Sequence, residues 1–399
     1  MSLVNALQDP SRPVFLFGST PPREGTTIEK AKESCAKFAA RSAVLAIDGF
    51  IVYDIQDECG RTTMERPFPF RKTMDPALYA SFFPAVSAKQ CVVYKCVVEN
   101  SMEDFDAWLD TATKTYYHTA FNFVGAASSS VQYKGPTLAT AGNRAVERGD
   151  CKFGCVTIPE RHTTKGNEDE NMIRKAKLGS EWFITQGIFS ADALVSMLNS
   201  YGQKCKERGM VPKKVVLTFA PCGRAKTMTF IKWLGMHVPE EVEQRILGAA
   251  VPVQESIVVL CELLKNVLLQ TGGSGVPLGI NVESLSIFKE EIDAAHELFQ
   301  KLQAILLNST GSPWAVRWFF VDRPLRRAES MDEQISAEQL ARAMLAIEAD
   351  RKKVEEDKKT DSHCGVVAKK GACCGVSCVA AASVLVAVSF MAGRWSQNK

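Results

Sequence analysis

The stretch CKFGCVTIPERHTT, from Cys151 to Thr164, begins as an apolar, β-branched run and ends in charged residues. Residues 152–158 have the composition of a strand that lies inside a sheet. Pro159 then stops the run, and Glu160 and His162 follow it directly. The break predicts that a buried strand reaches the rim of its sheet at this point.

Similar short apolar runs alternate with longer amphipathic stretches from the N-terminus to about Asp322. The amphipathic stretches with helical spacing include residues 27–44, 102–115, 170–180, 190–209 and 288–307. Counting the run above, the sequence contains eight candidate strands, at residues 14–17, 49–54, 91–98, 119–125, 152–158, 182–186, 214–220 and 280–287.

Strict alternation of strand and helix implies parallel strands, because each parallel pair needs a crossover that a helix can form. Eight such units predict an α/β fold, a (β/α)8 TIM-type barrel. A doubly wound open sheet is the alternative, but it would usually show a glycine-rich phosphate turn after its first strand. No such turn follows residues 14–17.

Composition agrees with one large domain and an appendage. The chain has 399 residues, of which 46% are hydrophobic, and a net charge of +3, which is too small to indicate a nucleic-acid partner. Thirteen cysteines without a repeating framework, and no N-terminal signal sequence, predict a reducing compartment. Cys151 and Cys155 lie about 13 Å apart along a strand, so we expect core residues and no metal site.

The C-terminal segment 371–393 has no charged residue, is about as long as a membrane-spanning helix, and lies between Lys370 and Arg394. It predicts a transmembrane tail anchor, with a barrel of residues 1–322 facing the cytosol. The alternative is a buried, alanine-rich helix. The segment 323–370 is dense in charge and predicts a helical linker. The short basic tail favours the mitochondrial outer membrane or a peroxisome-like organelle over the endoplasmic reticulum.

In a TIM barrel the active site forms at the C-terminal ends of the strands. The polar residues that end the apolar runs are therefore candidates for binding or chemistry, although an inert barrel would also have a polar rim. They include Asp54, Lys95, Glu160, Gln186 and Glu283.

Four segments, FLFGSTPPRE, CVTIPERH, WFITQGIFSADAL and LTFAPCGRAKTMTFIKWLGMHVPEE, resemble the methylenetetrahydrofolate reductase family in order and in strand position. The resemblance covers most of residues 14–306. It implies a flavin-bearing (β/α)8 barrel and an oxidoreductase of one-carbon folate metabolism. In such a family NAD(P)H reduces FAD, and the flavin reduces 5,10-methylenetetrahydrofolate.

The resemblance also implies roles for individual residues. Gln186 matches a glutamine that contacts the pterin, and Phe230 matches an aromatic residue shared by nicotinamide and folate. His162 matches a histidine near the flavin, whereas Glu168 and Lys175 fall where a helix meets its ribityl and phosphate groups. A cation such as Lys175 suits a pyrophosphate.

Two motifs depart from the family pattern. Where the family has FEFFPPR, with a glutamate that donates a proton to the pterin, this chain has Leu16 and Gly18 and no carboxylate before Glu24. Where the family has an arginine and an aspartate at the flavin, residues 124–130 read VGAASSS. Glu283, Glu160 or Asp57 is therefore the expected replacement acid, and the missing arginine and aspartate weaken the case for FAD in particular.

Three functions follow from these patterns. The first is a membrane-tethered reductase of the methylenetetrahydrofolate reductase type. The second is a catalytically weak or inactive folate- or nucleotide-binding barrel that acts as an adaptor at a membrane. The third is a barrel with an unrelated lyase or carbon-transfer activity, because a fold does not fix a function.

Overall fold

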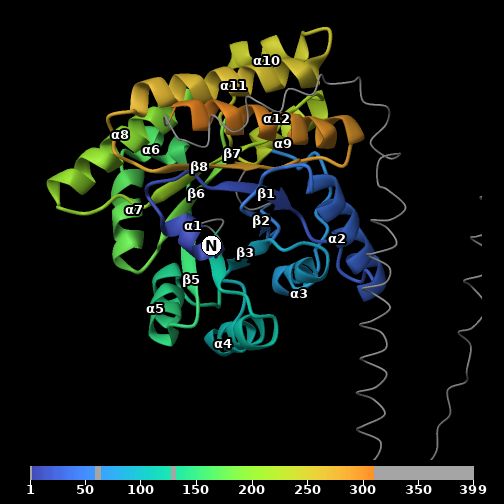
Figure 1. The fold of residues 1–399 in the computed structure, drawn as a ribbon, viewed down its shortest axis with the longest axis vertical. Helices are drawn as coiled ribbons and strands as arrows, with labels where there is room; N and C mark the ends of the chain where they lie inside the picture. Colours follow the sequence, from blue (N-terminus) through green and yellow to red (C-terminus); the bar gives the residue numbers. More distant parts are fainter. Residues whose placement is uncertain (1, 59–63, 127–131, 310–399) are drawn as a thin grey trace, which may run out of the picture. The chain divides into compact units, whose positions relative to one another are not determined.

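A closed barrel of eight parallel strands forms the centre of the protein, in a computed structural model that describes residues 2–58, 64–126 and 132–309. Each strand pairs with the next along the chain, and β8 pairs with β1 to close the barrel (Figure 1). The strands are β1 Phe15–Ser19, β2 Gly49–Val52, β3 Gln90–Cys96, β4 Ala120–Val124, β5 Lys152–Thr157, β6 Trp182–Gly187, β7 Lys214–Phe219 and β8 Leu278–Val282. The predicted (β/α)8 barrel is confirmed.

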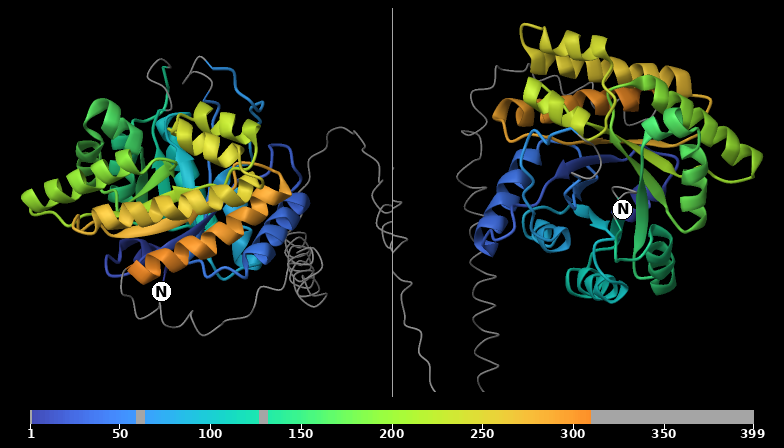
Figure 2. Two further views of the ribbon diagram at one scale, coloured as in Figure 1. Left: turned by 90° about the horizontal axis from the view of Figure 1, so that it is seen from above. Right: turned by 180° about the vertical axis from the view of Figure 1, so that it is seen from behind.

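Helices connect the strands and cover the outside of the barrel, as the two further views in Figure 2 show. The long helices α11 and α12 pack against each other, and α8 packs against α11. The α-helices are α1 Leu3–Gln8, α2 Ile28–Ser42, α3 Pro76–Ala80, α4 Met102–Asp110, α5 Leu138–Arg148, α6 Pro159–Lys165, α7 Glu168–Lys177, α8 Ala191–Glu207, α9 Ala225–Trp233, α10 Glu240–Leu247, α11 Pro252–Thr271 and α12 Lys289–Ser309. A 3-10 turn, Phe83–Ala85, and a π-helical turn, Thr111–Thr115, complete the described helical elements.

Local sequence signals define several helix ends. The Thr27 and Thr137 side chains accept hydrogen bonds from backbone N–H groups in the first turns of α2 and α5. Ser101 and Asp104 form a reciprocal capping box at the start of α4. At the end of α5, Gly149 has a φ of 70°, a left-handed conformation that glycine adopts without a steric penalty.

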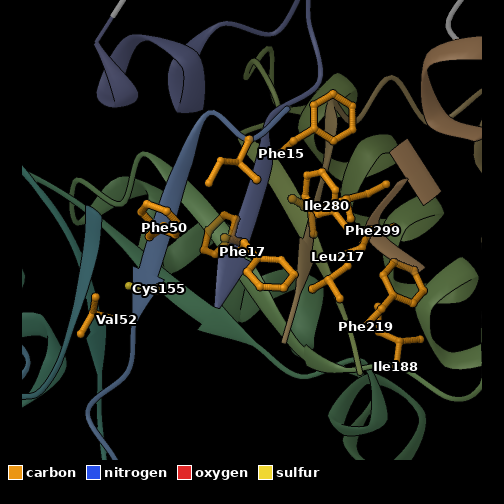
Figure 3. Close-up of a cluster of buried hydrophobic side chains, with 14 of the residues drawn as sticks. Phe15, Phe17, Phe50, Val52, Cys155, Ile188, Leu217, Phe219, Ile280 and Phe299 are labelled. Carbon is orange, nitrogen blue, oxygen red and sulfur yellow. The ribbon is translucent and has the colours of Figure 1, made fainter. Parts of the chain in front are cut away.

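Alternation along the strands separates two apolar cores. Phe15 and Phe17 of β1 point outward and pack on Phe299 of α12, with ring centroids 6.3 and 5.9 Å apart. Figure 3 shows these rings among the side chains of this outer core, which also includes Leu217 and Ile280. The inner core fills the barrel with residues of the other parity, including Leu16, Ile51, Val92, Trp182, Ile184 and Val216.

The N-terminal mouth of the barrel is closed by α1. Leu3 and Leu7 belong to the inner core. The buried Lys214 donates hydrogen bonds to the carbonyl oxygens of Ala6, at 2.6 Å, and Arg12, at 2.9 Å. Burial lowers the pKa of Lys214 to about 8. Among the described residues, α1 therefore covers the N-terminal end of the barrel.

Several sequence expectations are decided by these elements. Cys151 and Cys155 are buried, as predicted. The predicted strand 280–287 is wrong at its C-terminal end, because β8 stops at Val282 and the serines beyond it hydrogen-bond locally, Ser284 Oγ donating to the carbonyl oxygen of Ser286 at 3.0 Å.

The C-terminal predictions lie outside the described residues. The proposed linker 323–370 and membrane span 371–393 belong to this part of the chain. Within residues 2–58, 64–126 and 132–309, none of the helices has both the length and the apolar character that a membrane crossing requires.

Candidate functional site

A cavity of about 470 Å³ opens at the C-terminal mouth of the barrel. Residues in or just after all eight strands line it, together with residues of the helices α6, α7 and α9. We call it the mouth cavity; its polar lining includes Tyr53, Asp54, Arg66, Lys175, Gln186 and Glu283. Its volume is within the range of small-molecule sites, and its position is the one at which TIM barrels bind their ligands.

The floor of the mouth cavity is the last inward-facing layer of the barrel. Tyr53 follows β2, Tyr94 lies in β3 and Glu283 follows β8. Each of the three lies two positions after an inward-facing residue, which is Ile51, Val92 or Asn281. Because side chains alternate along a strand, all three point into the barrel. The Tyr53 and Tyr94 rings meet edge to face, with centroids 4.9 Å apart.

A hydrogen-bonded chain holds this floor in place. Asn281 Nδ2 donates to Tyr53 Oη at 2.8 Å and to Thr218 Oγ1 at 3.3 Å. Tyr53 in turn is hydrogen-bonded to the Glu283 carboxyl. Because Tyr53 Oη accepts from Asn281, its own proton is available to Glu283.

Glu283 has an altered acidity. Burial raises the pKa of its carboxyl to about 7, and the hydrogen bond with Tyr53 offsets part of this effect. The residue is half-buried and lines the mouth cavity. A carboxylic acid that is still partly protonated at neutral pH is suited to proton donation.

Gly18, at the end of β1, leaves room for this acid. A Cβ added to Gly18 would lie 2.8 Å from Tyr53 Cε2 and 2.9 Å from Glu283 Cβ. Such distances are too short for ordinary carbon contacts. Glu283 and Tyr53 therefore occupy the space that any side chain at position 18 would need.

Gln186 and Phe230 form one wall of the mouth cavity. Gln186 Nε2 donates to the carbonyl oxygen of Leu234 at 2.6 Å, while the buried Oε1 has no hydrogen-bond partner among the described residues. The wall therefore presents an unused acceptor, which favours a ligand with an N–H group. Phe230 lies nearly parallel to Trp233, with an interplanar angle of 12° and centroids 5.9 Å apart.

Asp54 is a second carboxyl in the mouth cavity. Its Oδ2 accepts from the Cys96 N–H at 2.7 Å and its Oδ1 accepts from Gln56 Nε2 at 2.7 Å. Burial raises its pKa, and the charge of Lys95 partly offsets this. Both carboxylate oxygens of Asp54 already accept hydrogen bonds from the protein. Asp54 therefore stabilises the local structure and is less available than Glu283 for chemistry.

The three residues assigned to the flavin by resemblance are in different surroundings. Lys175 lines the mouth cavity, donates to the Val156 carbonyl oxygen at 2.7 Å, and has a pKa that burial lowers. Glu168 is fully buried and accepts hydrogen bonds from Thr157 Oγ1, at 3.1 Å, and the Ile158 N–H, at 3.2 Å. His162 Nδ1 lies 3.8 Å from Asp169 Oδ1.

The lining therefore fits a flavin only in part. Of the three residues, Lys175 alone lines the mouth cavity, whereas Glu168 joins β5 to α7 and His162 faces the start of α7. Lys175 would suit the phosphate of a dinucleotide. The turn that replaces the family's arginine and aspartate lies largely outside the described residues.

Glu160, the other candidate acid, has a different position from Glu283. It belongs to the first turn of α6, because Pro159 starts a helix directly after β5, and its Oε1 accepts from the His237 N–H at 3.5 Å. It does not line the mouth cavity. In the part of the chain that the structure describes, no group of three or more potential metal ligands is present.

Three further residues of the site were not selected from the sequence. Tyr53 and Asn281 could have been found from the sequence, because the alternation of side chains along their strands predicts that both face the barrel interior. Arg66 has none, because it belongs to the loop between β2 and α3 and packs on Trp233, far away in the sequence.

Comparison with known proteins agrees with this architecture. No family model and no curated protein matches the chain. Among solved structures, an uncharacterized protein from Clostridium thermocellum that binds two copies of 5-methyl-5,6,7,8-tetrahydrofolic acid is 28% identical, with a TM-score of 0.63, over 73% of this chain and 95% of that chain.

Two more distant structures also align. 2,3-Dimethylmalate lyase, of the PEP mutase/isocitrate lyase superfamily, is 11% identical with a TM-score of 0.41, over 91% of this chain and 97% of that chain. A dihydropteroate synthase from Xanthomonas albilineans is 13% identical with a TM-score of 0.35, over 74% of this chain and 94% of that chain. At these scores neither structure carries an argument about this chain.

Proposed function

We propose that the barrel binds a reduced folate in the mouth cavity and reduces 5,10-methylenetetrahydrofolate to 5-methyltetrahydrofolate with a hydride from NAD(P)H. The observation that carries the proposal is the meeting of Gln186, Phe230 and Glu283, from three separate elements, around one cavity. The likeness to a structure that binds 5-methyltetrahydrofolate supports the substrate class.

Gln186 and Phe230 would bind the pterin. The free Oε1 of Gln186 is an acceptor for a pterin N–H, and its orientation is fixed by the hydrogen bond to Leu234. Phe230 offers a planar face, which Trp233 supports from one side. These two contacts would orient the substrate, and orientation is itself a large part of catalysis.

Glu283 would supply the proton. The methylene carbon of the substrate bridges N5 and N10, and protonation of N10 breaks the bond from that carbon to N10. The N5 iminium that results accepts a hydride at the methylene carbon, which becomes the methyl group of the product. One proton and one hydride are consumed, and NAD(P)H leaves as NAD(P)⁺.

This role follows from the surroundings of Glu283. The family acid on the first strand is missing, and Gly18 stands near its place. The acid that follows β8 occupies the adjacent space, with Tyr53 and Asn281 behind it. We infer that the proton donor has moved from the first strand to the eighth strand of the barrel.

A flavin would supply a route for the hydride between NAD(P)H and the folate. Lys175 would hold its phosphate, and no step above depends on it. Addition of FAD to the purified protein, with absorbance measured near the flavin bands, tests whether it is bound.

The direct test is turnover by the full chain. NAD(P)H oxidation is followed with 5,10-methylenetetrahydrofolate, with and without added FAD, and 5-methyltetrahydrofolate is measured by chromatography. Formation of the methyl product supports the reductase. Folate binding without turnover under every condition would replace it with the folate-binding adaptor, for which the missing family acid is the supporting observation.

A further inference from the structure

Arg66 carries a charge that the described residues do not fully neutralise. Its side chain is 12% exposed, and its Nε and Nη1 atoms are buried without a hydrogen bond. Nη1 lies 3.6 Å from Asp57 Oδ1, and the Asp57 side chain is 51% exposed. Because a buried cation is costly unless it is well paired, this site favours an additional anion.

Aromatic rings hold the Arg66 guanidinium in position. Its Cζ atom lies 4.5 Å from the ring centroid of Trp233, 5.3 Å from that of Phe70 and 5.7 Å from that of Phe230. Trp233 is itself fixed, because its Nε1 donates to the Met64 carbonyl oxygen at 3.1 Å. Stacking orders the planar guanidinium before a ligand arrives, which lowers the entropy cost of binding an oxyanion.

Arg66 lies beside the residues that are proposed to bind the pterin. Gln186 is hydrogen-bonded to Leu234, and Phe230 lies one helical turn before Leu234, about 6 Å along α9. Arg66 lies beside Phe230 and lines the same cavity. Gln186, Phe230 and Arg66 thus lie together at one part of the mouth cavity, where a folate held by Gln186 and Phe230 also carries its anionic glutamate tail.

We propose that Arg66 receives a carboxylate of the folate's glutamate tail, an inference that rests on the proposed folate-binding function and deepens it. The other cations of the mouth cavity are less suited to this role. Lys175 is already assigned to the phosphate of a dinucleotide, and its Nζ lies 3.8 Å from Glu168 Oε1. Arg161 belongs to α6, and its charge acts on the neighbouring Lys175.

The test compares two ligands that differ only in the tail. Binding of 5-methyltetrahydrofolate and of 5-methyltetrahydropteroate, which lacks the glutamate, is measured by calorimetry on the full chain and its Arg66→Met variant. The unaltered protein should bind the folate about 10- to 100-fold more tightly than the pteroate. The variant should bind both ligands with similar affinity, because the preference depends on the pair of groups.

Two further variants serve as controls. Arg71→Met removes an exposed cation from the same loop and should keep the preference for the folate. Arg161→Met removes the cation of α6 and should keep it as well. If Arg161→Met abolishes the preference, or Arg66→Met retains it, Arg66 is not the carboxylate site.

The remaining outcomes separate this inference from the function on which it rests. Equal affinity of the unaltered protein for both ligands would overturn the role of Arg66 while folate binding stands. Failure of both ligands to bind would overturn the folate function itself. If Arg66→Met weakens binding of NADH or NADPH and leaves the folate preference intact, the anion is a dinucleotide phosphate and the carboxylate assignment is wrong.

Discussion

Replacement of Glu283 with glutamine separates the chemistry of this residue from its effect on stability. The pKa of Glu283 is raised from 4.5 to about 7 in the folded protein. As pH rises from about 4.5 to 7, the unfolded chain loses this proton while the folded barrel keeps it, so the free energy of unfolding falls. Above pH 7 both states are ionised, and the burial penalty is fully present.

The shift corresponds to at most about 3 kcal/mol, and to about 1 to 3 kcal/mol when allowance is made for the side of Glu283 that faces the cavity. Glu283→Gln is neutral at every pH and avoids this penalty. We therefore expect the variant to be more stable than the unaltered protein at pH 8.5 by about 1 to 3 kcal/mol, and similar to it near pH 4.5. Urea unfolding followed by tryptophan fluorescence measures both values.

Turnover should change in the opposite direction. A proton donor must be protonated, so the reductase rate of the unaltered protein should fall as pH rises through about 7. Glu283→Gln should lower the rate by about 10- to 1,000-fold at pH 6.5, with folate affinity nearly unchanged. Glu147→Gln, which alters an exposed glutamate of α5, is the control for both measurements.

The reasoning fails at two separate points. If the difference in unfolding free energy between Glu283→Gln and the unaltered protein does not depend on pH, the pKa of Glu283 is not raised in the folded protein. If that difference is found but turnover is unchanged, Glu283 is a buried acid without a catalytic role. Loss of turnover in Glu160→Gln would then move the proton donor to α6.

Three other predictions follow from the structure and the sequence. Gln186→Ala should weaken folate binding by about 3- to 10-fold without unfolding the barrel, because one neutral hydrogen bond is lost; unchanged affinity in calorimetry would remove this residue from the site. Gly18→Ala should destabilise the barrel by about 1 to 3 kcal/mol in urea unfolding, because its methyl group would overlap Tyr53 and Glu283. An unchanged free energy of unfolding would mean that these two side chains shift to make room at little cost. Deletion of residues 371–399 should release the protein from membranes in a carbonate wash, and the prediction is wrong if the shortened chain stays in the membrane fraction.

Much of the fold was predictable because it depends on local periodicity. The strand and helix pattern predicted eight β/α units, and a closed barrel is the regular way to pair eight such parallel strands. The exact ends of the strands were harder to predict from the sequence. The run at 280–287 looked continuous, but β8 ends at Val282 because the serines that follow satisfy their hydrogen bonds within the loop.

The sequence by itself predicted the barrel and made Gln186 and Glu283 candidates, because strand ends of one parallel barrel must meet at one mouth. Phe230, in α9, was a candidate only through the family resemblance. Only the tertiary structure shows that Glu283 lines the mouth cavity and that Glu160 does not. Glu283 continues the inward parity of β8 and lies against Gly18, whereas Pro159 starts a helix and takes Glu160 out of that alternation. Arg66 depended entirely on packing, because the loop that carries it and its partner Trp233 approach each other only when the barrel has closed.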